Sequence, residues 1–384
     1  MTGRLPTADA PAAQRRLCAR LKRAGVTVNG GRPWDLQVHD ERFFRRVLTS
    51  GTLGLGESYM DGWWDCAAID QLVDRYFRSR IDRDGSRWIN GVEWFDYLRS
   101  RFFNLQNRAR ARQVGQRHYD IGNDLYRAML DPLMVYSCGY WKEADDLAAA
   151  QEAKLALAAV KLGLRPGMKL IDIGCGWGGM ARFAAEHYGA EVTGLTISER
   201  QAELAREACR ALNVDIRLQD FRELDEPCDR IVSIGMFEHV GYKNYRTFFE
   251  VARRCLPEDG LLLLHTIGGN EPVSYIDPWI DRYVFPNAML PSASQLTAAY
   301  EGLFVLEDWQ NFGPDYDRTL MAWHENFTAV WPRLSAAGRY DRRFRRMWEF
   351  YLKSCAGGFR ARRHQLWQLV LSPRGTDGRY DSPR

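Results

Sequence analysis

The 384-residue sequence has no long apolar run, and this excludes a helix that crosses a membrane. Its longest unbroken run of large aliphatic residues covers only positions 261–264, whereas a spanning helix needs about 20 apolar residues. The first 16 residues also lack the apolar segment of a signal peptide, so we expect no secretion signal there.

The sequence also lacks any CxxC pair among its eight cysteines, which argues against a disulfide framework and against a zinc site of that type. We therefore expect reduced thiols, a cytoplasmic protein and no metal site. The cysteines lie at positions 18, 66, 138, 175, 209, 228, 255 and 355.

Length and composition are those of an ordinary globular chain of two to three domains, with 46% apolar and 27% charged residues.

Charge is distributed unevenly along the chain. Residues 1–118 hold 21 basic and 13 acidic side chains, a net +8, so the remainder of the +4 chain carries −4. Six arginines and no acid lie in 97–117. A basic N-terminal part indicates an anionic partner, either nucleic acid or a membrane surface, unless it is simply a solvated face.

The order of helix-like and strand-like segments predicts two domains. We assign residues 1–112 to a small, mostly helical domain with one short hairpin, and 113–384 to an α/β domain. Apolar runs at 169–173, 191–195, 214–218, 230–234 and 261–266 alternate with helical patterns, which predicts a parallel sheet covered on both faces. Runs at 304–309 and 366–371 are candidate edge strands, and the segment 269–300 is a candidate cover for the site.

Residues 170–179, LIDIGCGWGG, form a glycine-rich loop between a predicted strand and a predicted helix, where open α/β sheets bind nucleotides. The spacing of Gly174, Gly176 and Gly179 also fits a dinucleotide site, with Glu199 near the position of its ribose-binding acid. However, Ser198 to Gln201 has the pattern of a helix capping box. The acidic Asp172 inside the strand favours S-adenosylmethionine over NAD and over a purely structural turn.

Two polar residues follow apolar strands. Glu238 comes after IVSIGMF and His265 after the run 261–264. The carboxyl ends of parallel strands share one edge of the sheet with the glycine loop, so these side chains form a candidate site. A buried, hydrogen-bonded pair that only supports the loop is the alternative interpretation.

The sequence resembles the cyclopropane-fatty-acyl-phospholipid synthases and their relatives, the mycolic acid cyclopropane synthases. The ordered matches extend over almost the whole chain, so together they are far more specific than the glycine loop alone. They are HYDIGNDLY at 118–126, YSCGYW at 136–141, IDIGCGWGG at 171–179, GLTISERQ at 194–201, GMFEHVG at 235–241, HTIG at 265–268, PWIDRYVFPNAMLPS at 278–292, NFGPDYDRTLMAW at 311–323 and CAGGFRARRHQLWQ at 355–368.

The resemblance implies a Rossmann-like class I S-adenosylmethionine-dependent methyltransferase fold. It also implies methylene transfer to a cis double bond in a phospholipid acyl chain. In such proteins the cofactor would be held by the residues matching Tyr136, Ser137, Asp172, Gly174, Gly176, Gly178, Thr196, Gln201, Asp220 and Phe221. A bicarbonate ion would act as the base that removes a proton from the carbocation, held by those matching Glu238, His265, Tyr316 and the backbone around Cys138.

Three other functions remain open at this point. The first is a related lipid methyltransferase that leaves a methyl branch. The second, from another class, is a catalytically inactive lipid- or cofactor-binding protein, and the third is a nucleic-acid methyltransferase. We favour a phospholipid substrate at an anionic membrane surface, with no nucleic acid and a possible homodimer. Residues 339–363 hold nine basic and two acidic residues with interleaved aromatics, which suits the inner face of a membrane. The alternative is a helix that packs on the sheet with its arginines in solvent.

Overall fold

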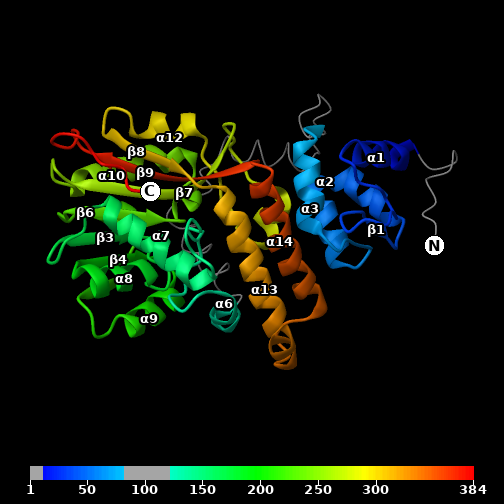
Figure 1. Ribbon diagram of the computed structural model, residues 1–384, viewed down its shortest axis with the longest axis horizontal. Coiled ribbons are helices and arrows are strands. Elements are labelled where there is room, and N and C mark those ends of the chain that lie inside the picture. Colours follow the sequence, from blue (N-terminus) through cyan, green and yellow to red (C-terminus); the bar gives the residue numbers. More distant parts are fainter. Residues whose placement is uncertain (1–11, 82–121) are drawn as a thin grey trace.

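The computed structural model describes residues 12–81 and 122–384, and its centre is a seven-stranded sheet (Figure 1). The strand order is β5-β4-β3-β6-β7-β9-β8. The five strands from β5 to β7 in this order are parallel, as expected. Of these, only β7 is clearly longer than predicted. They are β3 (Lys169–Ile173), β4 (Glu191–Thr196), β5 (Val214–Leu218), β6 (Arg230–Ile234) and β7 (Leu261–Gly269).

The last two strands, β8 (Val305–Asn311) and β9 (His364–Ser372), are antiparallel to their neighbours. The expectation that both are edge strands is correct for β8 and wrong for β9, which lies between β7 and β8. Consecutive residues Leu369, Val370 and Leu371 are all fully buried, so β9 is apolar on both faces and suits the interior of a sheet.

Helices cover both faces of the sheet, which confirms the α/β Rossmann-like class. Leu261 and Leu263 of β7 belong to the same apolar cluster as α7, α8 and α9. Leu262 and Leu264 belong to the cluster of α10 and α12 on the opposite face, as the alternation of side chains along a strand requires. The helices are α7 (Leu147–Lys161), α8 (Gly179–Tyr188), α9 (Glu199–Ala208), α10 (Tyr245–Cys255) and α12 (Ala293–Tyr300).

The N-terminal segment is helical, with α1 (Ala12–Arg23), α2 (Arg42–Met60) and α3 (Ile69–Arg78). Its two short strands, β1 (Gln37–Val38) and β2 (Trp64–Asp65), pair antiparallel. They are separated in sequence by α2, so the expected hairpin is wrong. The boundary predicted at residue 112 and the arginine-rich stretch 97–117 lie outside the described residues.

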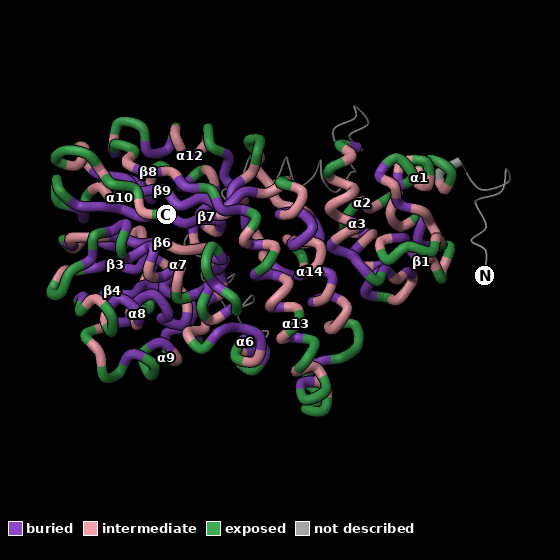
Figure 2. Tube along the Cα trace, in the orientation of Figure 1, coloured by how far each residue is buried: buried purple, intermediate pink, exposed green. Residues whose placement is uncertain are grey.

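Two long helices, α13 (Pro314–Ala336) and α14 (Arg342–Arg360), stand between the sheet and the N-terminal helices (Figure 1). Phe43 and Trp64 share one apolar cluster with Trp348 and Phe350 of α14. Helix α3 approaches α14 so closely that a Cβ at Gly357 would lie 2.3 Å from the backbone oxygen of Asp70. The N-terminal helices therefore complete their core on the rest of the chain (Figure 2).

This packing corrects the interpretation of the basic aromatic segment 339–363. Most of its aromatic side chains are buried inside the protein, so they are not available to a membrane surface: Tyr340, Trp348, Phe350, Tyr351 and Phe359. Helix α14 does not pack face-on against the sheet either, since its main neighbours are α13, α3 and α2.

Several arginines of α14 are also occupied by acids of the N-terminal segment. The guanidinium of Arg343 lies 3.0 Å from Asp61, and that of Arg346 lies 2.7 Å from Asp65. Arg360 bridges Asp70 of α3 and Asp317 of α13.

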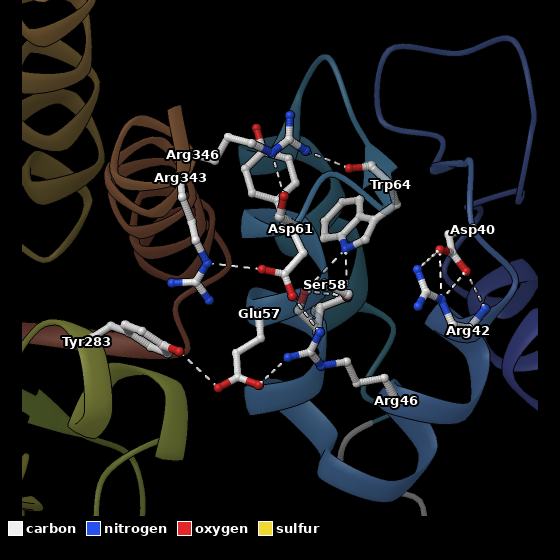
Figure 3. A network of polar contacts seen from close by, with 12 residues as sticks. Asp40, Arg42, Arg46, Glu57, Ser58, Asp61, Trp64, Tyr283, Arg343 and Arg346 are labelled. Carbon is white, nitrogen blue, oxygen red and sulfur yellow. Dashed lines mark hydrogen bonds and ion pairs between the residues drawn. The ribbon is translucent and has the colours of Figure 1, made fainter. Parts of the chain in front are cut away.

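The segment 269–300 connects the N-terminal helices to the sheet. Its first helix, α11 (Pro278–Tyr283), lies against α2, where the phenol of Tyr283 donates to Glu57 over 2.9 Å (Figure 3). The indole of Trp279 is buried against Gly56, where a Cβ would lie 2.3 Å from ring atoms. The same Glu57 pairs with Arg46 of α2, 2.7 Å away.

We expect Gly56→Ala to destabilise the protein by about 1–3 kcal/mol, although alanine is the better helix former, because the new methyl group overlaps the Trp279 ring. Urea unfolding measures the change. Gly31→Ala is the control, since a Cβ there has no neighbour within 4 Å. Equal midpoints for the two variants would contradict this docking of α11 on α2.

Candidate active site

Glu238 lies in the short helix η3 (Phe237–His239), which follows β6. The side chain is buried, and its Oε1 accepts a hydrogen bond from the backbone N–H of Ile267 in β7 over 2.7 Å. Its Oε2 is also buried and has no hydrogen-bond partner among the described residues. Burial raises the pKa of this carboxyl to about 7.

The segment 269–300 contacts Glu238 directly. The backbone oxygen of Glu238 accepts from the N–H of Met289 over 2.7 Å, and Gly269 donates to the oxygen of Pro291 over 2.8 Å. The segment 269–300 therefore fixes the backbone of Glu238, in addition to its contact with α2.

His265 lies in β7, two residues before Ile267 and on the same face of the strand. The amide nitrogen of Gln368 donates to its Nδ1 over 3.3 Å, so the ring proton lies on Nε2. Burial lowers the pKa of His265 well below its usual value, and the ring is neutral. Its Nε2 is a buried donor without a partner among the described residues.

Tyr316, in the first turn of α13, extends the same region. Its phenol is within electrostatic range of Glu238, Cys138 and Tyr136, and burial raises its pKa well above the usual value. Its ring stacks on Phe359 at 4.5 Å between centroids. The structure thus brings Tyr316 and Glu238 together from distant parts of the chain.

Cys138 is completely buried, and burial raises the pKa of its thiol well above the usual value, so the thiol is protonated. Its surroundings are fixed by Thr319, whose hydroxyl oxygen accepts from the N–H of Gly139 over 3.0 Å and from the indole of Trp141 over 2.8 Å. This cysteine is therefore no activated nucleophile, and its part in the site is that of a small buried residue in a fixed loop.

Tyr136 and Ser137 directly precede Cys138 in the loop 131–138. The Tyr136 hydroxyl donates to the Tyr351 hydroxyl over 2.9 Å, and its ring lies 5.0 Å from that of Trp323. The Ser137 hydroxyl accepts from the ammonium group of Lys154 over 2.8 Å. Buried aromatic faces of this kind favour a nearby cation.

Sequence reasoning missed Gln151 and Lys154, which are completely buried in α7 although both are polar. The amide of Gln151 donates to the backbone oxygen of Ser137 over 2.7 Å. The available signal was their spacing of three residues within the mostly apolar segment 147–161, which places both on one face of the helix.

Asp172 lies in β3, directly before the glycine loop, and is buried. Its Oδ2 has no hydrogen-bond partner in the described part of the chain, and burial raises its pKa to about 7. Gly174, Gly176 and Gly178 all have positive φ, at 87°, 56° and 86°. A Cβ at Gly174 would lie 2.5 Å from the Met236 side chain, so the loop cannot accept a larger residue there without a shift.

Thr196 and Gln201 are paired at the end of β4, where the Thr196 hydroxyl donates to the Gln201 amide oxygen over 2.9 Å. Ser198 caps α9 by accepting from the N–H of Gln201. The expected capping box is therefore only half formed, since the Gln201 side chain bonds to Thr196. Glu199 is exposed at the start of α9, beyond the strand.

Asp220 caps the short helix η2 (Phe221–Glu223) and is buried. Both of its carboxylate oxygens accept from the Arg222 guanidinium, at 2.8 and 2.6 Å, so its charge is compensated. Phe221 is half-buried beside it, 5.7 Å from the Phe248 ring. Their contact with an adenine ring stays a prediction.

These residues fit S-adenosylmethionine. The glycines allow a ligand to approach the backbone at the carboxyl end of β3, and Asp172 offers a buried acceptor oxygen that no described group uses. The described residues contain no cluster of three or more metal-ligating side chains. No helix in 12–81 or 122–384 has the length and apolarity needed to cross a membrane.

Comparisons with known proteins agree with this arrangement. Residues 106–369 match the family model described as mycolic acid cyclopropane synthetase. The chain is 52% identical over 355 residues to the cyclopropane-fatty-acyl-phospholipid synthase of Escherichia coli, covering 92% of this chain and 91% of that protein. It is 38% identical over 268 residues to cyclopropane mycolic acid synthase 1 of Mycobacterium tuberculosis, covering 64% and 91%.

Solved structures show the same similarity. The cyclopropane synthase MmaA2 from Mycobacterium tuberculosis superimposes with a TM-score of 0.63 at 35% identity, covering 68% of this chain and 98% of that one. A complex of the mycolic acid cyclopropane synthase CmaA1 with S-adenosylhomocysteine gives 0.62 at 35% identity, with the same coverage. Coclaurine N-methyltransferase, at 23% identity and a TM-score of 0.67, shares the fold over 84% of this chain and 99% of its own length.

The raised pKa of Glu238 makes a prediction about stability. Because the folded-state pKa is about 7 against an ordinary 4.5, the folded state favours the neutral carboxyl, and its stabilising effect is lost as the pH rises through 7. Glu238→Gln cannot ionise, so it should be more stable than the parent protein at pH 8, by about 3 kcal/mol.

Urea unfolding at pH 8 and at pH 5 measures this difference, which should largely disappear at the lower pH. Glu258→Gln, at an exposed glutamate, is the matched control and should show no such gain. A Glu238→Gln variant that is less stable than the parent at pH 8 would contradict the desolvated environment described for this carboxyl.

Proposed function

The chain belongs to the mycolic acid cyclopropane synthetase family, and from this membership we propose that it forms cyclopropane rings in unsaturated phospholipid acyl chains. It is an S-adenosylmethionine-dependent enzyme of the cyclopropane-fatty-acyl-phospholipid synthase type. The observation that carries the proposal is the pair of unpartnered polar atoms, Glu238 Oε2 and His265 Nε2, at the carboxyl edge of the family's sheet.

The cofactor would be held along the ends of β3, β4 and β5. Asp172, the glycine loop, Tyr136 and Ser137 would hold its amino-acid end, Thr196 and Gln201 its middle, and Asp220 with Phe221 its adenine. When bound, S-adenosylmethionine supplies an electrophilic methyl group. The protein's own part is to keep the methyl group and the double bond aligned in a site without water.

Ring closure requires a base, since a carbocation on the acyl chain must lose a proton from the newly added methyl group. The residues fit bicarbonate in this role. His265 Nε2–H is an unused donor and Glu238 Oε2 an unused acceptor, which match the charged oxygens and the O–H of a hydrogencarbonate ion. Tyr316 and the backbone around Cys138 would complete the set. The rings of the half-buried Tyr136 and of the buried Trp323 and Phe359 would stabilise the cation.

We expect Glu238→Gln to reduce cyclopropane formation at least about 100-fold, because the variant loses the carboxylate oxygen that would accept from the O–H of bicarbonate. The variant should still bind S-adenosylhomocysteine. The assay is lipid analysis by gas chromatography and mass spectrometry, with NMR of the ring protons, after expression in a host without cyclopropane lipids.

Glu258→Gln is again the control and should produce normal amounts of cyclopropane lipid. If the parent protein yields methyl-branched rather than cyclopropane chains, the cation is quenched in another way and the proposed product is wrong. If Glu238→Gln retains near-normal turnover with bicarbonate present, its assigned role is wrong.

The substrate would be reached at an anionic membrane surface. The support comes from the N-terminal helices, where a surface cavity of about 450 Å³ is lined by Arg23, Arg75 and Arg78 together with Asp74. The Arg75 guanidinium lies 3.7 Å from the Trp34 ring centroid, which holds it in place. Since the aromatics of α14 are buried, these arginines are the better candidates for contact with anionic lipid.

We therefore expect binding to vesicles to increase with anionic lipid content and to weaken as salt shortens the Debye length. The variant Arg23→Gln/Arg75→Gln should bind anionic vesicles several-fold more weakly in sedimentation assays. The control is Arg165→Gln/Arg210→Gln, which removes two exposed arginines elsewhere. Equal binding to neutral and anionic vesicles at all salt concentrations would refute the electrostatic attraction.

A further inference from the structure

Lys154 is a charged residue with no exposed surface, in the middle of helix α7. Burying an ammonium group in a protein interior is costly unless hydrogen bonds and opposite charges compensate it. Its position therefore needs a reason, and the family fold by itself gives none.

The groups that compensate the ammonium charge lie in the loop 131–138 and at the end of β3. The ammonium group donates to the Ser137 hydroxyl over 2.8 Å, and it is in electrostatic contact with the carboxyls of Asp131 and Asp172. Asp131 in turn accepts from the N–H groups of Leu133 and Val135, at 2.8 and 2.9 Å. One buried cation thus connects the loop 131–138 with the end of β3.

Helix α7 makes a second contact with the loop 131–138 through Gln151, one turn before Lys154. The Gln151 amide donates to the backbone oxygen of Ser137 over 2.7 Å, and also to that of Val135 over 3.3 Å. Ser137 is therefore fixed through both its backbone and its hydroxyl, whereas Asp172 Oδ2 is left without any hydrogen-bond partner in the described residues.

We propose that Lys154 is a positioning residue for S-adenosylmethionine, which holds the Ser137 hydroxyl in place and sets a positive charge beside the Asp172 carboxyl at the cofactor's amino-acid end. The proposal rests on the proposed function, because that function assigns Ser137 and Asp172 to the cofactor. Without Lys154 the Ser137 hydroxyl is free to rotate, and Asp172 is left in an apolar surrounding that favours its neutral form.

Other titratable groups near these two residues do not supply the same charge. Lys154 is the cation that lowers the pKa of Asp172, while the thiols that face Asp172 are buried and protonated. The groups involved are Asp131, Cys138 and His265 around Lys154, and Cys175 of the glycine loop and Cys209 of α9 around Asp172.

The chain offers a matched control in the same helix. Lys161 is also buried in α7, but its ammonium group lies 2.6 Å from Gln310 and 2.9 Å from Asp308, both in β8. Lys154→Met and Lys161→Met therefore remove the same kind of group from the same helix, and only the first faces the glycine loop.

Calorimetric titration with S-adenosylhomocysteine, without lipid, tests the proposal. At pH 7 we expect Lys154→Met to bind at least about tenfold more weakly than the parent protein, and Lys161→Met to remain within about twofold. Loss of the cation raises the pKa of Asp172, and burial lowers the pKa of Lys154 itself to about 8, so the affinities of Lys154→Met and the parent should converge as the pH rises to 9.

Unchanged affinity in Lys154→Met would overturn the proposal, and so would an equal loss in both variants, which indicates a general weakening of α7. If Lys154→Met does not fold, Lys154→Arg decides, because it keeps the charge and should retain the parent's pH dependence of binding. A parent protein that does not bind S-adenosylhomocysteine at all would refute the proposed function itself, whatever the variants do.

Discussion

Two buried carboxylates at one edge of the sheet, Asp172 and Glu238, are the constraint on which the rest of the structure depends. Each has one oxygen without a hydrogen-bond partner among the described residues, and burial raises each pKa to about 7. Such groups destabilise a fold unless the surrounding elements are held firmly. The apolar clusters on both faces of the sheet provide that support, since they fix the strands whose ends position the two acids.

Support also comes from outside the sheet. The segment 269–300 bonds to the backbone of Glu238 through Met289 and is anchored on α2 through Trp279 and Tyr283. Arginines of α14 also form ion pairs with acids of the N-terminal segment, namely Arg343 with Asp61 (Figure 3), Arg346 with Asp65 and Arg360 with Asp70. A residue in α2 is therefore connected to the reacting end of the site through a short series of direct contacts.

The sequence was sufficient for the five parallel strands and for placing Glu238 and His265 near the carboxyl ends of β6 and β7, because apolar runs that end in glycine or a polar residue have few structural alternatives. The roles of these two residues stay predictions. The sequence was insufficient where long-range packing decides which side chains are buried and where a strand lies in the sheet. The aromatics of 339–363 look like an interfacial segment until residues of α2, β2 and α11 are seen to pack on Phe350, and β9 resembles an edge strand until β8 pairs with it. Lys154 was missed because a lysine within a helical pattern normally faces solvent, and only the loop 131–138 makes it buried.

The two buried lysines of α7 show how one helix serves both stability and function. Lys161 pairs with Asp308 over 2.9 Å, and Arg384 also contacts this carboxylate at 2.6 Å, so the ion-pair partner of Lys161 lies in β8, away from the glycine loop. Lys154 has a neutral serine as its hydrogen-bond partner, and Asp172 keeps an acceptor oxygen open beside the glycine loop. A site left with unused acceptors and donors is less stable empty than occupied, because a ligand that binds only the folded state stabilises it. The pattern of unsatisfied atoms at Asp172, Glu238 and His265 thus marks where the fold gives up stability in order to bind.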